Sequence, residues 1–546
     1  MEWKSRIIIA TQGGIWMHRS VRHLLSIILI IAIAFSIAGC REKPVARQAE
    51  IKDELIIALD RYTGGKKPPE GIGVASCTQI YEPLLFLNNK LEIQPGLVTS
   101  WERIDDLNWR LKLRKGVKFH NGKEFDAESA KFAFTMYLDK TGYAAQRIKE
   151  VVNQDSFKIV DKHTLDVKTI KPYPFFPTLL THPSVVGVEP EAFKKGEIVG
   201  TGPYKFKEEV TDQHVIVERN DDYWGKKPFF KRVVFKIVPD QNTRVMALKT
   251  GAVDMALYPS LPSLKELQRE YTAFYGFKGL PFIMFNFEKP YLKDINLRKA
   301  LCMAIDKEKI AKEIYQGTAD PANSLIPKEL LYSIEGEYRG ISYNLTEAKK
   351  LLKESGYTDN NNDGYVDKNG KNLELKFVYW AEDQEYKSVA ETIASSLKDL
   401  GVKVNISALE AAAYYEVIEE KGDYDICLDA TGVFWGSSST MLYDHFYSKS
   451  GLIGFHRLKD AEVDKLIEEG MELESRNDIK GAAEKYKAAQ KRAIDELVFL
   501  YPVVFQKHIV VAKKNVKDFS PFPFYGMFYS GCTENMLGEI KWGLPG

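Results

Sequence analysis

A run of acidic and amide side chains, Asp359-Asn360-Asn361-Asn362-Asp363-Gly364 followed by Asp367, has the residue types that bind calcium. Alternating oxygen ligands before a glycine resemble the first half of a calcium-binding loop. The twelfth position of such a loop is Gly370 here, where a bidentate glutamate is required. A polar β-turn between a helix that ends at Gly356 and a strand that begins at Leu373 is the simpler interpretation, and calcium remains the alternative.

The sequence patterns of the common enzyme classes are absent. There is no Gly-rich phosphate loop ending in Lys-Ser or Lys-Thr, no His-Glu-x-x-His, no Cys-x-x-Cys and no Gly-x-Ser-x-Gly. Two partial glycine patterns, Gly71-Ile72-Gly73 and Gly200-Thr201-Gly202, occur, but Pro203 after the second favours a turn. Because no nucleophile can be paired with a base, we expect neither an enzyme nor a cofactor. A secreted hydrolase is the alternative, and it would need a reactive set of residues that the sequence does not reveal.

The N-terminal region has the order of a secretory signal peptide. The uncharged apolar run Leu24–Ala38 follows Arg19 and Arg22 and is shorter than the roughly 20 residues that span a bilayer. The following Gly39-Cys40 completes a sequence that resembles the bacterial lipobox, in which the cysteine thiol is acylated. A short membrane anchor with an accidental cysteine is the alternative.

Residues 1–39 are therefore predicted to be a lipoprotein signal peptide, residues 40–54 a flexible tether, and Cys40 the lipidated residue. The protein would then be extracytoplasmic and anchored to the cell membrane, in the periplasmic space where an outer membrane is present. The true start remains open between Met1 and Met17.

The composition is that of a large folded protein. The chain has 546 residues, 45% of them hydrophobic and 28% charged, which is room for about three domain-sized units. Lys plus Arg number 76 against 75 Asp plus Glu, so nucleic acid is a poor candidate partner. The remaining cysteines are far apart in apolar settings and are predicted to be buried free thiols: Cys77, Cys302, Cys427 and Cys532.

Periodicity predicts a mixed α/β protein. Leu373 to Tyr379 alternates as a strand, Val389 to Leu400 carries an apolar stripe at helical spacing, and Val402 to Ile406 alternates again. Gly401 can end the helix in a left-handed conformation. This βαβ unit implies a parallel sheet with a right-handed crossover. In the N-terminal half, Trp109 to Leu113 alternates as a strand with one exposed face. Asp126 can cap the helix that follows this strand.

A series of short motifs resembles the family 5 solute-binding proteins, the peptide and nickel receptors of ABC importers. The motifs occur in order over nearly the whole chain after the tether, and any one of them is weak alone. They are Tyr81–Leu84, Pro95–Leu97, Ser100-Trp101, Leu113–Gly122, Phe125–Glu128, Gly200–Tyr204, Arg219-Asn220, Tyr223–Gly225, Pro239-Asp240, Thr243-Arg244, Leu248–Gly251, Val253-Asp254, Asn296–Leu301, Ala304–Asp306, Gly454-Phe455 and Val463–Leu466.

The resemblance implies a two-lobed α/β fold of the periplasmic-binding-protein type, class II, with the extra subdomain of family 5 in lobe I. It places lobe I at residues 55–282, lobe II at residues 283–507 and a C-terminal return to lobe I at residues 508–546. The chain would cross between lobes near Ile283 to Asn286 and near Val503 to Val510.

The function that this resemblance implies is capture of a small solute between the lobes and its delivery to an ABC permease. The expected partners are the permease and ATPase subunits, a short peptide or a nickel chelate, and the membrane through the lipid alone. The protein is expected to be a monomer that does not bind nucleic acid.

The two ligand classes remain close alternatives. Peptide-binding members carry an aspartate in the loop that here reads Thr431 to Thr440, where it pairs with the α-amino group of the peptide. This chain has no aspartate in that loop, although Asp429 lies close enough to be considered as a replacement. The nickel branch matches better at Phe119–Glu128, Tyr173–Phe176 and Gly317-Thr318. However, nickel receptors bind the carboxylates of the chelator with an arginine. Its expected position falls in Thr181–Ser184 of this chain, which contains no arginine.

Five residues are candidates for ligand contact. Trp435 is a candidate stacking ring, and Ser437, in a stretch that continues to Thr440, offers hydroxyls or forms a turn. His182 and His445 are candidate nickel donors, with a structural histidine as the alternative for each. Arg147 is the fifth candidate. It would supply the cation in place of the missing arginine, with a position on a solvated helix face as the alternative.

Replacing Trp435 by Ala should weaken ligand binding without unfolding the protein, because a stacking ring contributes to the complex more than to the fold. Titration of ligand monitored by calorimetry, alongside a thermal melt, measures both effects. Unchanged affinity would remove Trp435 from the site.

Overall fold

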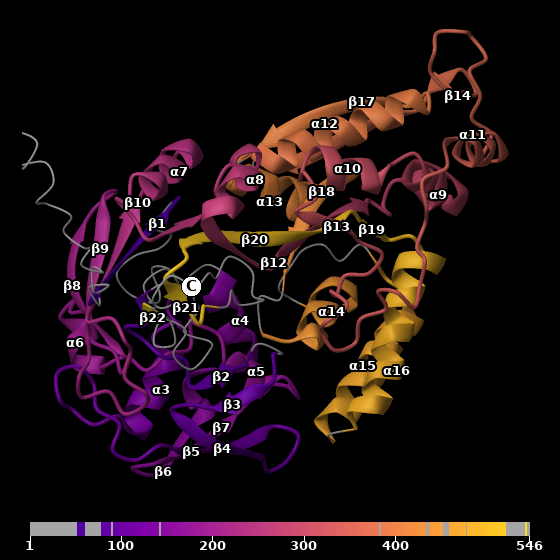
Figure 1. Ribbon diagram of the computed structural model, residues 1–546. Coiled ribbons are helices and arrows are strands. Elements are labelled where there is room, and N and C mark those ends of the chain that lie inside the picture. Colours follow the sequence, from indigo (N-terminus) through magenta and orange to yellow (C-terminus); the bar gives the residue numbers. More distant parts are fainter. Residues whose placement is uncertain are drawn as a thin grey trace, which may run out of the picture. The chain divides into compact units, whose positions relative to one another are not determined.

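The computed structural model describes residues 52–60, 78–88, 91–140, 143–381, 384–432, 436–450, 458–476, 478–519 and 541–542. Several predictions therefore lie outside the described residues: the signal peptide, Cys40, Cys77, Trp435 and Cys532. Within the described part, a mixed sheet of twelve strands is the central feature (Figure 1). Its order is β17-β16-β18-β12-β20-β11-β1-β10-β9-β8, with β13 beside β20 and β19 beside β12.

The first part of the sheet is built around β1 (Glu54–Leu59). It pairs in parallel with β10 (Arg232–Ile237) and β11 (Met255–Leu257). Leu55, Ile57 and Leu59 belong to one apolar cluster and Ala58 to another, so both faces of this strand are buried, as expected inside a parallel sheet. Two helices complete the second cluster, α7 (Gln241–Lys249) and α8 (Leu261–Glu270). Two antiparallel strands extend the edge of the sheet beyond β10, namely β9 (His214–Arg219) and β8 (Tyr204–Val210).

A separate antiparallel sheet of four strands lies in the N-terminal half. Its order is β4 (Val98–Arg103), β5 (Asn108–Leu113), β7 (Thr164–Lys168) and β6 (Phe157–Asp161). The predicted alternation is confirmed in β5, where Trp109, Leu111 and Leu113 are buried. The predicted cap is also confirmed, because an Asp126 carboxylate oxygen accepts from the Ser129 N–H at 3.0 Å at the start of α3 (Ala127–Thr135).

The second part of the sheet contains the predicted βαβ unit. Strand β16 (Glu374–Trp380) leads through α12 (Gln384–Asp399) to β17 (Lys403–Leu409), and the two strands are parallel. Gly401 has φ of +88°, the left-handed conformation expected after the helix. The chain then returns through α13 (Ala411–Tyr415) to β18 (Ile426–Thr431) on the other side of β16. Because the two crossovers run in opposite directions, α12 and α13 cover opposite faces of this sheet.

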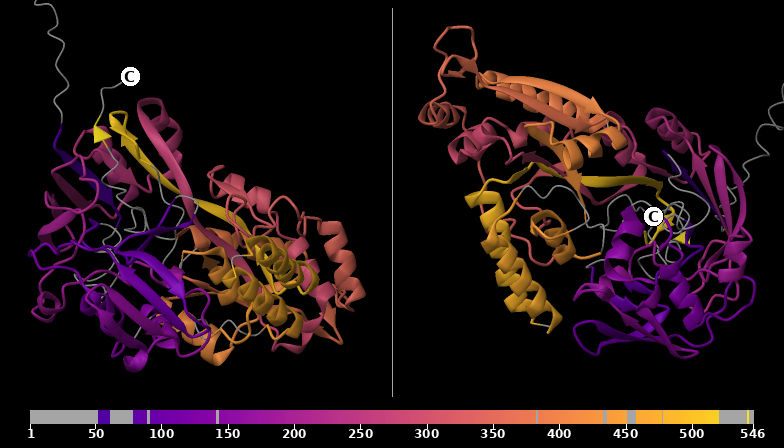
Figure 2. Two further views of the ribbon diagram at one scale, coloured as in Figure 1. Left: turned by 90° about the horizontal axis from the view of Figure 1, so that it is seen from below. Right: turned by 180° about the vertical axis from the view of Figure 1, so that it is seen from behind.

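Strands β12 (Tyr271–Phe285) and β20 (Val504–Lys513) connect the two parts of the sheet and lie side by side (Figures 1 and 2). From Tyr271 to Gly279, β12 pairs antiparallel with β20, with a register shift between Phe277 and Gly279. From Leu280 onward, β12 pairs with β18 and with β19 (Leu500–Pro502). The positions where the sequence predicts that the chain crosses between lobes fall at or beside these strands, whereas the exact lobe boundaries stay a prediction.

The helices after β18 form a group of their own. Helix α14 (Ser438–Phe446) is followed by α15 (Ala461–Ser475) and α16 (Ile479–Lys491), which lie side by side. Among the described residues, no helix is both long enough and apolar enough to cross a bilayer. The other elements are β2 (Leu85–Leu87), β3 (Ile93–Pro95), α4 (Tyr143–Val151), η2 (Gln154–Ser156), α5 (Phe176–Leu179), α6 (Pro190–Lys194), η3 (Pro290–Lys293), α9 (Ile295–Met303), α10 (Lys307–Glu313), β13 (Ala319–Pro321), α11 (Leu345–Glu354), β14 (Asp367–Lys368), β15 (Lys371–Asn372), η4 (Glu416–Lys421), η5 (Arg492–Glu496), β21 (Val516–Lys517) and β22 (Lys541–Trp542).

The oxygen-rich segment at Asp359 is a hydrogen-bonded turn. The Asp359 carboxylate accepts from the N–H groups of Asp363 and Gly364 at 3.2 and 3.1 Å. The Asp367 carboxylate accepts from the backbone N–H of Asn360 at 2.8 Å. These bonds fit the interpretation as a polar turn between a helix and a strand.

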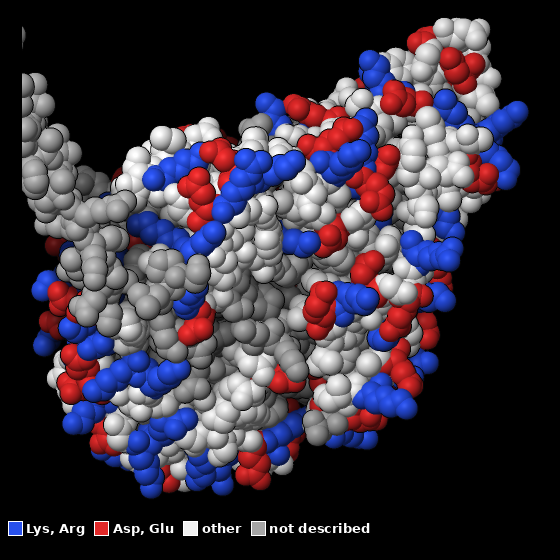
Figure 3. All heavy atoms as spheres, viewed as in Figure 1, with Lys and Arg blue, Asp and Glu red and all other residues white. Residues whose placement is uncertain are grey.

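Two further features agree with the composition. Cys302 and Cys427 are buried free thiols, as predicted. In the face seen in Figure 3, lysine and arginine are interspersed with aspartate and glutamate over the described surface.

Candidate functional site

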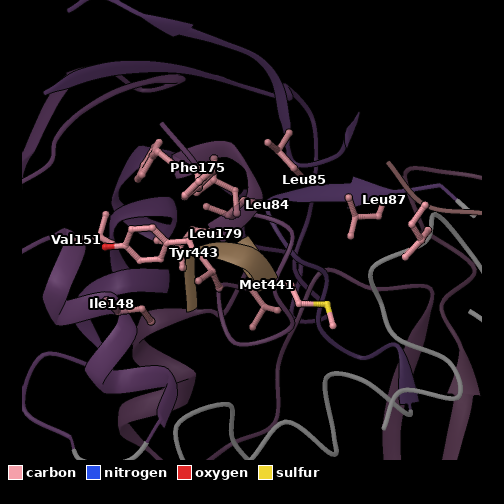
Figure 4. Packing of buried hydrophobic residues seen from close by; sticks show 14 of the residues in the cluster. Leu84, Leu85, Leu87, Ile148, Val151, Phe175, Leu179, Met441 and Tyr443 are labelled. Atoms are coloured by element: carbon pink, nitrogen blue, oxygen red, sulfur yellow. The ribbon is translucent and has the colours of Figure 1, made fainter. Parts of the chain in front are cut away.

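Helix α14 lies where segments from distant parts of the sequence meet. All of its 9 residues are buried. Figure 4 shows Met441 and Tyr443 of α14 among apolar residues of the N-terminal half. These residues come from β2 and the residue before it, α4 and the α5 region, and they are Leu84, Leu85, Leu87, Ile148, Val151, Phe175 and Leu179. The helix is therefore part of the core of the N-terminal half although it follows β18.

A buried ion pair joins α14 to α4. The guanidinium of Arg147 pairs with the Asp444 carboxylate, and both side chains are almost completely inaccessible to solvent. Glu150 lies within 4.0 Å of Arg147, and burial raises the pKa of its carboxyl. Because a charge taken out of water needs a close partner, this pair constrains how α4 and α14 can be placed. Arg147 was predicted as a ligand-binding cation, and in this structure an internal carboxylate binds it.

Aromatic rings surround this ion pair. Tyr173 and Tyr443 both interact electrostatically with Arg147, Asp444 and Glu150. Phe175 packs edge-on against Tyr443, with ring centroids 5.7 Å apart. Burial raises the pKa of Tyr173 to about 12. The phenols therefore stay neutral at physiological pH and add no charge to the surroundings of the pair.

The two candidate histidines are buried in the same region. His182 accepts through Nδ1 from the Ser184 N–H at 3.1 Å, which leaves its hydrogen on Nε2. Burial, with the nearby Arg147 charge, lowers the pKa of His182 to about 3. His445 donates from Nδ1 to the Met441 carbonyl at 2.8 Å, and burial lowers its pKa as well. Both rings are therefore neutral near pH 7.

Ser437 is the N-cap of α14. Its hydroxyl accepts from the Ser439 N–H at 3.1 Å, and the Thr440 hydroxyl donates to the Ser437 carbonyl at 2.8 Å. The preceding Gly436 is pressed against Thr181 and Leu87, since an added Cβ would lie within 2.7 Å of both side chains. The hydroxyls of this stretch thus organise the start of α14, and the close approach at Gly436 places this start against the segment that contains His182.

The structure brings four of the five candidates together around α14: Arg147, His182, Ser437 and His445. Trp435 lies outside the described residues. Asp444, which sequence reasoning missed, is the partner that ties the group together. Nothing in the local pattern indicates it, since Arg147 and Asp444 are 297 positions apart. In the described ranges, no three His, Cys, Asp or Glu side chains come together to hold a metal ion.

A second polar group lies at the crossing strands. Lys278, at the register shift of β12, has its Nζ 3.3 Å from a carboxylate oxygen of Glu385 in the first turn of α12. Gln506 of β20 donates to the Tyr315 hydroxyl at 2.8 Å and to Glu385 at 3.2 Å. Side chains from both crossing strands are therefore bonded to the second part of the molecule. These contacts hold the crossing strands against the second part of the molecule. Among these side chains, no nucleophile lies beside a base.

Comparison with known proteins gives a family match over most of the chain. Residues 92–452 match the model for bacterial extracellular solute-binding proteins, family 5. The chain is 27% identical over 457 residues to the oligopeptide-binding protein AppA of Bacillus subtilis, covering 77% of this chain and 80% of that protein. It is 29% identical over 492 residues to the nickel-binding periplasmic protein of Escherichia coli, covering 85% and 89%. It is also 29% identical over 497 residues to heme-binding protein A of Haemophilus influenzae, covering 83% and 87%.

Solved structures share the fold. NikA from Brucella suis in complex with Fe(III)-EDTA superposes with a TM-score of 0.77 at 23% identity, covering 88% of this chain and 99% of that chain. DppA from Helicobacter pylori in complex with the peptide STSA superposes with a TM-score of 0.72 at 21% identity, covering 90% and 98%. The predicted two-lobed α/β fold is thereby confirmed.

Replacing Asp444 by Asn should lower the free energy of unfolding by about 3–5 kcal/mol, because it leaves the Arg147 charge buried without its counter-ion. Urea denaturation followed by circular dichroism measures the change. The matched control is Glu472→Gln, which breaks the exposed pair with Arg476 within α15 and should change stability by less than about 0.5 kcal/mol. Equal stability of Asp444→Asn and the control would contradict this role of the pair.

Proposed function

This chain belongs to family 5 of the bacterial extracellular solute-binding proteins, and on that premise we propose that it captures a small solute between two lobes and delivers it to an ABC permease. The protein itself carries out no chemistry on the solute. The alternative of a secreted hydrolase has no support from the site, because the described polar groups there bind one another and none forms a nucleophile–base pair.

The observation that carries the proposal is the pair of long strands β12 and β20. They connect the two parts of the large sheet. Each part has an apolar cluster of its own, which contains Phe377 in the second part and Ala58 in the first, and a larger cluster extends across both parts. A solute that contacts both lobes favours the closed arrangement by the difference between its affinities for the closed and open states. Bending at the crossing strands supplies that motion, and the permease then recognises the closed form.

The solute class remains between a short peptide and a nickel or other metal chelate. Relatives in both classes support this pair of candidates, since one is named as an oligopeptide-binding protein and another as a nickel-binding protein. The neutral imidazoles of His182 and His445 have the protonation state that binds a metal. The aromatic surroundings of α14 would equally suit the apolar parts of a peptide.

Binding should be saturable and stoichiometric, and it should raise the melting temperature, because a ligand that binds only the folded form stabilises it by mass action. Small-angle X-ray scattering should show a smaller radius of gyration in the presence of that ligand. Native mass spectrometry of protein purified from its own host identifies a retained metal or peptide as the first ligand to test. Steady turnover of peptide, or unchanged scattering with every solute that binds, would contradict the proposal.

We also propose that the lipidated Cys40 holds the protein at the membrane surface. Replacing Cys40 by Ser should abolish incorporation of labelled palmitate into the protein, because the acyl chains depend on the cysteine thiol. Metabolic labelling followed by immunoprecipitation measures this, with Cys302→Ser as the control for loss of a thiol elsewhere. Undiminished labelling of the Cys40 variant would contradict the lipid anchor.

A further inference from the structure

A cluster of polar side chains lies where β12 changes its pairing partner. The chain reads Gly276-Phe277-Lys278-Gly279 at this point, and the register of β12 against β20 shifts between Phe277 and Gly279. Up to Gly279, β12 pairs with β20, and from Leu280 onward it pairs with β18 and β19. A strand bends at such a shift, so Lys278 lies where we expect the two parts of the sheet to turn against each other.

The Lys278 side chain contacts both parts of the sheet. Its Nζ lies 3.3 Å from a carboxylate oxygen of Glu385, in the first turn of α12. It also lies 5.9 Å from the ring centroid of Tyr258, the residue after β11. Tyr258 is held in the first part, because its N–H donates to the Ile509 carbonyl at 2.9 Å and its hydroxyl lies 2.6 Å from Nδ1 of His508. One ammonium group thus connects the end of β11 with the start of α12.

Glu385 is bonded to both crossing strands. Gln506 of β20, which pairs with Gly279 across the ladder, donates from its amide to the Glu385 carboxylate at 3.2 Å. Lys278 of β12 adds the charged contact. The side chains of Lys278 and Glu385 are 22% and 32% exposed, and Gln506 is buried. These contacts are therefore partly withdrawn from water and stronger than those of a fully exposed ion pair.

A cavity of about 30 Å³ lies among these side chains. The first part lines it with Gln241 at the start of α7 and with Tyr258, and the second part lines it with Thr318 and Glu385. The two parts therefore meet here without the close packing of a protein interior. Polar contacts, rather than apolar packing, hold the parts together at this point.

The same arrangement places α14 in the core of the N-terminal half (Figure 4). The bonds at Glu385 and the packing of α14 thus occur together, in one relative position of the two parts. A movement that took α14 away from the N-terminal half would carry α12 with the second part, past Tyr258 and the bend in β12.

We propose that Glu385 is the latch of the hinge: its bonds to Lys278 and Gln506 stabilise the arrangement in which α14 packs on the N-terminal half, and they break when the lobes separate. The proposal rests on the proposed function, because it names the side chains that set the balance between the closed and open receptor. A more populated closed state raises the apparent affinity for a solute that binds it. The latch would therefore change the affinity for different solutes by the same factor.

The test measures the separation of the lobes in the full-length protein without added solute. Spin labels at Lys158→Cys in β6 and Lys398→Cys near the end of α12, both exposed positions, report the distance by pulsed electron paramagnetic resonance. Labelling without these two substitutions gives the background from the native cysteines. The test variant is Glu385→Gln, which removes the charge and keeps the shape. The matched control is Glu391→Gln, which breaks an exposed pair with Lys387 on the same helix.

We expect two populations of distances in the wild type. The ratio of separated to contacting lobes should be about 3- to 10-fold higher in Glu385→Gln, because a partly buried charged contact is lost. The control should match the wild type. Lys278→Gln should raise the same ratio, and its combination with Glu385→Gln should add little, since both substitutions remove one interaction.

Salt gives a second measurement that does not depend on the folding of a variant. Raising sodium chloride from 0.1 M to 1 M should increase the separated population of the wild type, because ions screen the contact between Lys278 and Glu385. The populations of Glu385→Gln should respond less.

Four results would each overturn the latch: an unchanged ratio in Glu385→Gln, an equal change in the control, additive effects of Lys278→Gln and Glu385→Gln, or one distance in the wild type that salt does not alter. A lower melting temperature of Glu385→Gln with an unchanged ratio would also overturn it, because the contact would then stabilise only the fold. These failures differ from failure of the receptor function, in which the scattering of the wild type stays the same with every solute that binds.

Discussion

The pairing of β12 with β20 is the constraint on which the rest of the structure depends. Two antiparallel strands connect sheet regions that otherwise have different neighbouring strands and different helices, although the largest apolar cluster extends across both regions. A backbone ladder of this kind holds the register of the strands, whereas the register shift at Lys278 provides a local bend. In the proposed function, one part rotates against the other by bending at these strands, and the ladder keeps the two parts connected.

Helix α14 has contacts on two sides, with the N-terminal half and with α15, so such a rotation must either break some of these contacts or move the helix together with one side. Its apolar side chains pack on β2, α4 and α5, and its Ser439 hydroxyl donates to the half-buried Glu474 of α15 at 3.1 Å. Glu474 also accepts from the hydroxyls of Tyr332 and Tyr486, each at 2.9 Å. The helix is thus held on one side by apolar packing and by the buried Arg147–Asp444 ion pair, and on the other side by hydrogen bonds.

The charges near α14 have unequal environments although they lie in the same part of the fold. Arg147 and Asp444 compensate one another, so their burial costs less than that of either charge alone. Asp429, by contrast, accepts from the Ala430 N–H and the Tyr414 hydroxyl, and burial raises the pKa of its carboxyl to about 7.

The sequence by itself determined the local elements and the family. The alternation in β5 and β16, the stripe of α12, the caps at Asp126 and Gly401, and the ordered motifs depend on neighbouring residues. Only the tertiary structure decided which charged groups are compensated. Arg147 looked like a residue available to a ligand until folding placed Asp444 beside it, and Glu385 gave no local sign that side chains of both crossing strands bond to it. The physical reason is that the cost of burying a charge depends on partners hundreds of residues away, which periodicity and spacing do not encode.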